Sequence, residues 1–270
     1  MGPTKITTLL FDCDNTLVMS EERAFIACAT LANEMLGERG ISDRYTGPQL
    51  LKEFVGQNFR GMILKLQEKY KFDISPKDLD TYVERELATV IDMLHGKVPD
   101  PDDAEKELGP VRSCDGVDEE LEKLHKSGKY LMSVVSSSAL PRVQASIEIA
   151  GQAKYFNPEH VYSAATSMEE PKSKPDKAIY VWAMLRLGEY VSGVKNQSLS
   201  PSECVAIEDS KSGATAAVAA GIKTVGYTGS YDDDEVEKMT QVLKDTGCVI
   251  IIHNWSEFPS CLRKIENGEV

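Results

Sequence analysis

Residues 8–17 read TLLFDCDNTL, an apolar run that ends in two aspartates, Asp12 and Asp14. The run predicts a buried strand, and side chains two apart on an extended segment face the same side. The two carboxylates therefore point together, while Cys13 points away. Because neighbouring carboxylates repel, the pair indicates a proton or a cation between them, and Mg²⁺ is the hard cation that prefers oxygen ligands. Two acids that merely cap a turn at a strand end are the alternative.

The composition is that of an ordinary globular protein: 270 residues, 41% of them hydrophobic, with a formal net charge of −13. This length accommodates a core domain and a smaller second one. The negative charge argues against a nucleic-acid or anionic-membrane partner. No apolar run reaches the length of a signal peptide or a membrane span, and the six cysteines form no Cys-x-x-Cys pair. We expect a cytoplasmic protein, monomeric and without a membrane or nucleic-acid partner.

Short apolar runs alternate with helical patterns over most of the chain. Two of these patterns, at 118–128 and 211–221, end in glycine directly before an apolar run. Repeated strand–helix–strand units predict an α/β fold with a doubly wound parallel sheet, that is, a Rossmann-like core. The expected strands are 7–13, 131–137, 161–165, 204–209, 223–227 and 249–253.

Residues 19–110 break this alternation and read as a series of amphipathic helices. We therefore expect residues 1–18 and 111–270 to form the Rossmann-like core, and 19–110 to form a helical domain inserted after the first strand. The Pro- and acid-rich stretch 95–110 is the expected return linker.

Polar residues also follow other predicted strands. Ser136 and Ser137 lie where VVS leaves the sheet, and Glu208 and Asp209 end CVAIED. In open parallel sheets, ligands bind at the carboxyl ends of the strands. The serines could hold phosphoryl oxygens, and the two acids are candidate metal ligands, although capping of the following helices would also explain these residues.

Lysines precede the next predicted helix, in EEPKSKPDKAIYVW. Lys172 and Lys174 are the only basic residues expected near the acidic strand ends. A lysine there could neutralise both a nucleophilic carboxylate and a phosphoryl group in transfer.

In their order along the chain, these motifs resemble the haloacid dehalogenase-like hydrolase superfamily. The matching elements are Asp-x-Asp-x-Thr after the first strand, serine after a later one, Lys-x-x-Pro-Asp before a helix, and Glu-Asp-Ser-x-x-Gly after another strand. The resemblance covers about residues 5–230, and it implies that the helical insertion is the cap domain of one large branch. It also implies phosphoryl transfer, since dehalogenases of this superfamily lack the second aspartate.

The resemblance implies that Asp12 is the nucleophile that becomes an aspartyl phosphate, and that Asp14 is the general acid and base. Mg²⁺ would be held by a carboxylate oxygen of Asp12, the main-chain carbonyl of Asp14 and the Asp209 carboxylate. Glu208 would be a direct or a water-mediated ligand.

The resemblance also assigns residues to the phosphoryl group. Ser136 would hydrogen-bond its oxygens, with Ser137 and Thr16 as neighbouring substrate-binding residues. Lys172 is the expected catalytic lysine because it keeps the Lys-x-x-Pro-Asp spacing. Lys174 is the alternative.

Two positions depart from the family pattern. Asn15 stands where glycine is commonest, and asparagine tolerates a left-handed backbone better than most residues. Asp115 takes the proline position of the usual Pro-Gly-Val linker, which puts the stiffness of that hinge in doubt.

Substrate choice is expected to lie in the cap loop 54–61, FVGQNFRG, where Gln57 and Arg60 offer hydrogen bonds or charge. These groups suit the hydroxyls of a sugar or polyol phosphate. A β-phosphoglucomutase-like sugar phosphate mutase is the main alternative, but it would carry a histidine near the start of the cap, where this chain has Ala24. A non-catalytic binding module is the other alternative. The acidic stretch 231–239 is expected to be a solvated loop and helix start.

Overall fold

The chain divides into two compact units, one formed by Met1–Met19 with Arg112–Val270 and the other by Ser20–Val111. The computed structural model describes residues 5–54, 58–96, 98 and 107–270. Gln57 and most of the expected return linker 95–110 therefore lie outside the described residues. We refer to the two units as the sheet unit and the helical unit.

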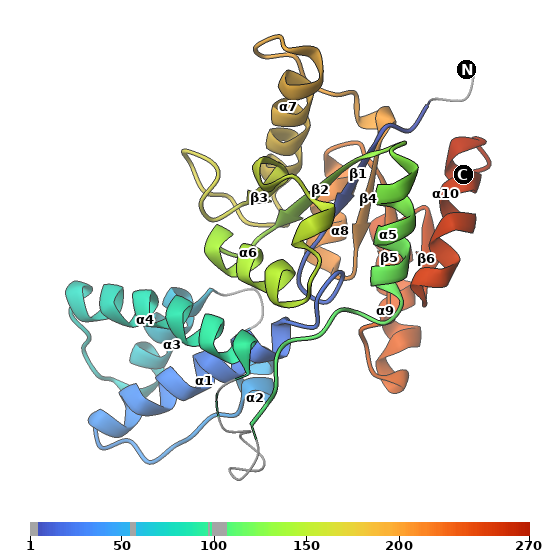
Figure 1. Ribbon diagram of the computed structural model, residues 1–270. Helices are drawn as coiled ribbons and strands as arrows, with labels where there is room; N and C mark the ends of the chain where they lie inside the picture. The colour runs from blue at the N-terminus through green and yellow to red at the C-terminus, as the bar shows by residue number, and fades with distance from the viewer. Residues whose placement is uncertain (1–4, 55–57, 97, 99–106) are drawn as a thin grey trace. The chain divides into compact units, whose positions relative to one another are not determined.

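The sheet unit is built on six parallel strands in the order β3-β2-β1-β4-β5-β6 (Figure 1). This arrangement confirms the predicted doubly wound Rossmann-like sheet. Every predicted strand is present; β5 has the predicted bounds, and the other five are slightly shorter than their apolar runs. The strands are β1 Thr8–Phe11, β2 Leu131–Ser136, β3 Val161–Ser163, β4 Cys204–Glu208, β5 Lys223–Tyr227 and β6 Ile250–Ile252.

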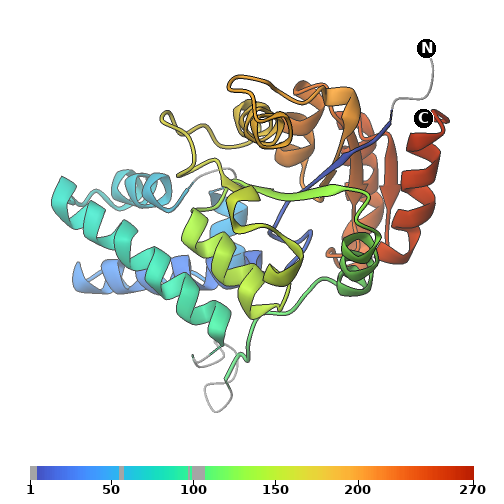
Figure 2. The ribbon, with the colours of Figure 1, turned by 45° about the horizontal axis from the view of Figure 1, so that its top comes forward.

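Helices cover both faces of the sheet because side chains alternate along the strands. Leu10 packs in one buried cluster with residues of α7 (Ala178–Ser192) and α8 (Lys211–Ala219), whereas Phe11 contacts the rings of Phe156 and Trp255. Figure 2 shows the sheet unit after a 45° rotation. Its α-helices are α5 Val117–Ser127, α6 Leu140–Ile149, α7 Ala178–Ser192, α8 Lys211–Ala219, α9 Asp233–Thr246 and α10 Phe258–Glu266.

The acidic stretch 231–239 runs from a turn into α9, with Asp232 as the N-cap residue and three acids in the first turn. Negative side chains at this position interact favourably with the positive end of a helix. The expectation of an exposed loop and helix start is confirmed.

The helical unit contains α1 Glu21–Glu38, α2 Gly47–Glu53, α3 Phe59–Tyr70 and α4 Pro76–His95. Local signals set its helix ends: Thr46 forms a capping box at α2, Ser75 caps α4, and Gly96 ends α4 in a left-handed conformation. Buried side chains from all four helices, among them Leu31, Leu66 and Leu79, form one core.

None of the described helices is long and apolar enough to cross a membrane. The cytoplasmic location and the monomeric state stay predictions.

We expect Trp255→Ala to lower the free energy of unfolding by about 3–5 kcal/mol, as for other large-to-small core substitutions. Trp255 is fully buried and contacts the rings of Phe11, Tyr227 and Phe258. Urea unfolding measures the change. The matched control is Val191→Ala, at a side chain that is 63% exposed, which should change stability by less than about 0.5 kcal/mol. Similar values for the two variants would contradict the packing shown here.

Candidate active site

The candidate site lies where the strand order reverses. From β1 the chain moves outward through β2 to β3, then returns to β4 beside β1 and continues outward to β6. The carboxyl ends of β1 and β4 therefore flank a topological switch point, the usual ligand site of an open α/β sheet. Asp12 directly follows β1, Glu208 ends β4, and Asp209 follows it.

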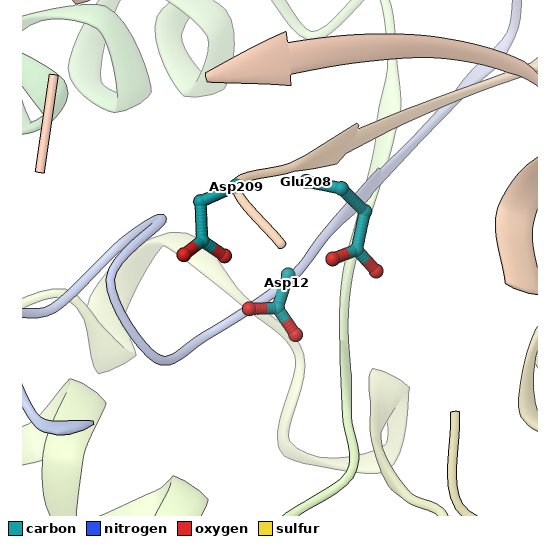
Figure 3. A group of neighbouring side chains, drawn as sticks. All are labelled: Asp12, Glu208 and Asp209. Atoms are coloured by element: carbon teal, nitrogen blue, oxygen red, sulfur yellow. The ribbon is translucent and has the colours of Figure 1, made fainter. Parts of the chain in front are cut away.

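Three carboxylates meet at this point (Figure 3). Asp12, Glu208 and Asp209 each offer a ligand oxygen, and these oxygens lie within 4.8 Å of one another. All three residues are buried. Asp12 and Glu208 lie on the face that Leu10 and Ala206 share with α7 and α8, because each follows its apolar neighbour by two residues.

Lys174 contacts two of these carboxylates. Its Nζ donates to Oδ1 of Asp12 at 2.5 Å, to Oε1 of Glu208 at 2.6 Å and to the backbone oxygen of Val135 at 2.8 Å. A protonated lysine has three N–H donors, so these bonds use all of them. The Lys174 side chain is only 4% exposed, and the three hydrogen bonds fix its orientation.

Glu208 is held from two further sides. The hydroxyl of Tyr180, in α7, donates to its Oε1. Oε2 lies against Gly213 in α8, where a Cβ would be 1.8 Å away, so only glycine leaves room for this carboxylate. The last position of the Glu-Asp-Ser-x-x-Gly motif is therefore glycine because a larger residue would collide with Glu208.

Burial dominates the electrostatics of this network. It raises the pKa of Asp12 above its ordinary value, although Lys174 opposes the shift. Burial likewise raises the pKa of Glu208 to about 7 against the same lysine. For Lys174, burial alone would lower the pKa, but Asp12 and Glu208 outweigh it, so the pKa lies above its usual range and the ammonium form persists. The carboxylates thus carry a desolvation cost that a bound cation would reduce.

The structure places Lys174 at Asp12, where the sequence analysis expected Lys172. Lys172 is exposed, two residues earlier in the segment before α7. The backbone N–H of Lys174 donates to Oγ of Ser137 at 3.3 Å, which fixes the segment beside the end of β2 and directs the Lys174 side chain inward. The spacing of the two lysines along the chain could not show which of them the hydrogen bond to Ser137 would bring to Asp12.

Asp14 has different partners from Asp12. Its Oδ1 accepts a hydrogen bond from the Arg142 guanidinium at 2.6 Å, and its Oδ2 accepts one from Oγ of Ser138 at 2.7 Å. The expectation that only Lys172 and Lys174 supply positive charge near these acids is therefore wrong. Arg142 lies in the first turn of α6, a helix that the sequence analysis did not predict.

The predicted phosphate-binding residues lie around the same strand ends. Ser136 is the last residue of β2, is 1% exposed, and its Oγ accepts from the backbone N–H of Ser138. Ser137 anchors the segment before α7. Oγ1 of Thr16 donates to Asp209 at 3.2 Å, so in this structure Thr16 contacts a predicted metal ligand.

Asn15 has φ of +56°, a left-handed conformation that asparagine tolerates better than most residues. Its backbone N–H donates to the oxygen of Val18 at 2.7 Å, and the backbone N–H groups of Leu17 and Val18 both donate to the oxygen of Cys13. The segment after β1 thus folds into a tight turn that carries both aspartates.

The remaining predicted site residues belong to the helical unit or its undescribed part. Arg60 lies in α3 and forms an ion pair with Asp80 at 2.5 Å. Gln57 lies outside the described residues. Their roles toward a substrate stay predictions.

The donor set fits a hard divalent cation such as Mg²⁺. All three side chains offer oxygen, which Mg²⁺ prefers to nitrogen or sulfur. Within the described part of the chain, no hydrogen-bond donor reaches the buried Oε2 of Glu208. Lys174 and Arg142 offset part of the negative charge gathered here, and a divalent cation would offset more.

We expect Lys174→Met to lower the free energy of unfolding by about 3–5 kcal/mol in metal-free buffer at pH 8, because it leaves Asp12 and Glu208 buried without their cation. Lys172→Met is the matched control, and at this exposed position the change should be within about 0.5 kcal/mol. Denaturant unfolding measures both. Equal effects of the two substitutions would show that Lys174 does not balance this charge.

No curated protein sequence matches this chain significantly. Residues 9–227 match the family described as haloacid dehalogenase-like hydrolase.

Solved structures share the fold. A family IA, variant 3 hydrolase from Entamoeba histolytica has a TM-score of 0.71 and 22% identity, over 97% of this chain and 100% of the other. A predicted phosphoglycolate phosphatase from Haemophilus somnus has a TM-score of 0.70 and 17% identity, with coverage of 97% and 100%. CbbY from Rhodobacter sphaeroides, in complex with xylulose 1,5-bisphosphate, has a TM-score of 0.68 and 19% identity, with coverage of 93% and 96%.

These neighbours are less than 25% identical to this chain, so they establish the fold alone. The family match covers most of the chain and includes both aspartates of the first turn, the serines at the end of β2 and the acid pair at the end of β4. The chain therefore belongs to the haloacid dehalogenase-like hydrolase family.

Proposed function

We propose that this protein is a Mg²⁺-dependent phosphatase that hydrolyses a small phosphomonoester through an aspartyl phosphate on Asp12. The observation that carries the proposal is that the two aspartates have different hydrogen-bond partners. Asp12 is buried beside Lys174 and the acid pair of β4, whereas Asp14 is held separately by Arg142 and Ser138. These different surroundings support a nucleophilic role for Asp12 and a proton-exchange role for Asp14.

In the first half-reaction, a carboxylate oxygen of Asp12 attacks phosphorus. A bond forms between this oxygen and phosphorus, and the ester P–O bond breaks. The leaving oxygen takes the proton of Asp14, so the alcohol departs neutral and Asp14 becomes a carboxylate.

In the second half-reaction, the Asp14 carboxylate removes a proton from a water molecule as its oxygen attacks the phosphorus of the aspartyl phosphate. The bond between phosphorus and the Asp12 oxygen breaks. Inorganic phosphate leaves, and Asp12 and Asp14 return to their starting forms.

Neighbouring groups stabilise the charge that develops on the phosphoryl oxygens. In this proposal Lys174 neutralises negative charge on Asp12 and on the phosphoryl group. The hydroxyls of Ser136 and Ser137 donate hydrogen bonds to the phosphoryl oxygens. Asp12, the main-chain carbonyl of Asp14 and Asp209 would hold Mg²⁺, with Glu208 direct or through water. When bound, Mg²⁺ would neutralise charge on Asp12 and the phosphoryl oxygens.

The substrate is proposed to be a sugar or polyol phosphate, and the helical unit is proposed to be a cap. The xylulose bisphosphate bound to CbbY supports a phosphorylated sugar. Arg60 and Gln57 are the candidate contacts to the non-reacting end of the substrate. Closure of a cap over the site would have to exclude water, which favours a small metabolite as the substrate.

The decisive experiment measures phosphate release from sugar, polyol, glycolate and nucleotide monoesters with Mg²⁺. We expect the wild type to cleave a narrow set of small esters. Asp12→Asn should be inactive, and Asp14→Asn should be about 10²–10⁴-fold slower on alkyl esters. Asp234→Asn, in the exposed first turn of α9, is the matched control and should retain wild-type activity. Interconversion of glucose phosphate isomers with a bisphosphate primer, in place of hydrolysis, would favour the mutase.

Metal binding can be tested without turnover. In isothermal titration with Mg²⁺ in the absence of substrate, Asp209→Asn should bind at least about tenfold more weakly than the wild type, because it removes one ligand of the set. Asp234→Asn again serves as the control and should bind like the wild type. Equal affinities of Asp209→Asn and the wild type would refute the assignment of this acid cluster as the metal site.

A further inference from the structure

Both carboxylate oxygens of Asp14 are held by the segment that follows β2. Arg142 donates to Oδ1 at 2.6 Å and Ser138 donates to Oδ2 at 2.7 Å. Two bonds to two different oxygens restrict rotation about both side-chain torsions of an aspartate. Its carboxylate is therefore fixed in direction as well as in place.

The position of Arg142 is unfavourable for the helix that carries it. Arg142 lies in the first turn of α6, which has no acidic residue in that turn. A cation at a helix N-terminus opposes the helix dipole, where an acid would be favourable. The Arg142 and Asp14 side chains are 15% and 20% exposed, so their ion pair is largely shielded from solvent. The contact with Asp14 offsets this unfavourable position.

An arginine suits this place because its guanidinium stays protonated in proteins. It can orient a carboxylate without taking part in the proton exchange. An ionised carboxylate has about four lone-pair sites, so the hydrogen bonds from Arg142 and Ser138 do not by themselves prevent Asp14 from exchanging a proton with a reacting oxygen.

We propose that Arg142, assisted by Ser138, is a positioning residue that aims the Asp14 carboxylate at the leaving oxygen and then at the attacking water. This proposal rests on the phosphatase function proposed above. It divides the two positive groups of the site: Lys174 serves the nucleophile, and Arg142 serves the proton carrier.

Leaving groups of different acidity separate this role from simple structural support. An alkyl phosphate such as glycerol phosphate needs protonation of its leaving oxygen, whereas p-nitrophenyl phosphate releases a stable phenolate. The ratio kcat/KM reports the steps up to departure of the leaving group. A misplaced Asp14 should therefore lower kcat/KM for the alkyl ester far more than for the aryl ester.

We expect Arg142→Met to lower kcat/KM for the alkyl ester by about 10–100-fold, part of the 10²–10⁴-fold that general acid catalysis supplies. For p-nitrophenyl phosphate, kcat/KM should change by less than about threefold. For this aryl ester kcat should still fall, because hydrolysis of the aspartyl phosphate also needs Asp14. A burst of nitrophenolate should precede this slow step. Ser138→Ala should show the same pattern more weakly, and Arg142→Lys should recover part of the loss.

The double variant Arg142→Met/Asp14→Asn tests whether Arg142 acts through Asp14. If it does, the double variant should be no slower than Asp14→Asn alone on the alkyl ester. The matched control is Arg186→Met, which removes an arginine that is 50% exposed and paired with Glu189 in α7, and it should change neither ester. Thermal unfolding of each variant checks folding. If Arg142→Met does not fold, Ser138→Ala and Arg142→Lys carry the same comparison.

Two results overturn the proposal while the phosphatase function stands: equal losses of kcat/KM on both esters, or a further loss in the double variant. Either result would assign Arg142 to substrate binding or to folding. A wild type that releases no phosphate from any ester would refute the proposed function, and the positioning role with it.

Discussion

The candidate site depends on one buried ammonium group. Lys174 Nζ bonds to Asp12, Glu208 and the backbone of β2, and so connects three neighbouring strands at their carboxyl ends. Burial alone would favour protonated, neutral acids there. The lysine makes it possible for two carboxylates to lie this close together inside the protein. A further cation is still favoured, because burial continues to raise the pKa values of both acids.

A second feature of the structure is that the two aspartates of the first turn pair with different positive side chains. Asp12 directly follows β1, and the turn after it, with Asn15 in a left-handed conformation, brings Asp14 to α6. Each aspartate thereby meets its own cation, one from the segment before α7 and one from α6. The same residue type, two positions apart in one turn, thus has two different environments. A nucleophile and a proton carrier require such a difference.

Much of the fold and of the candidate site could be predicted from local patterns in the sequence. Apolar runs ending in polar residues predicted the strands. The strand ends predicted Asp12, Asp14, Glu208 and Asp209 as candidate site residues, because parallel strands bring their carboxyl ends to one edge. The choice between Lys172 and Lys174 could not be made in this way. It depended on a hydrogen bond from the Lys174 backbone to Ser137, a contact between segments 37 residues apart.

The sequence by itself determined the fold class, the family and the acids of the candidate site, since each is encoded in a short segment whose periodicity or spacing is visible along the chain. Only the tertiary structure decided which positive groups face those acids. Lys174 reaches Asp12 across 162 positions of the sequence, and Arg142 reaches Asp14 across 128. Long, flexible side chains on loops and helix starts carry no periodic signal, so their partners are fixed only when the sheet brings distant segments together.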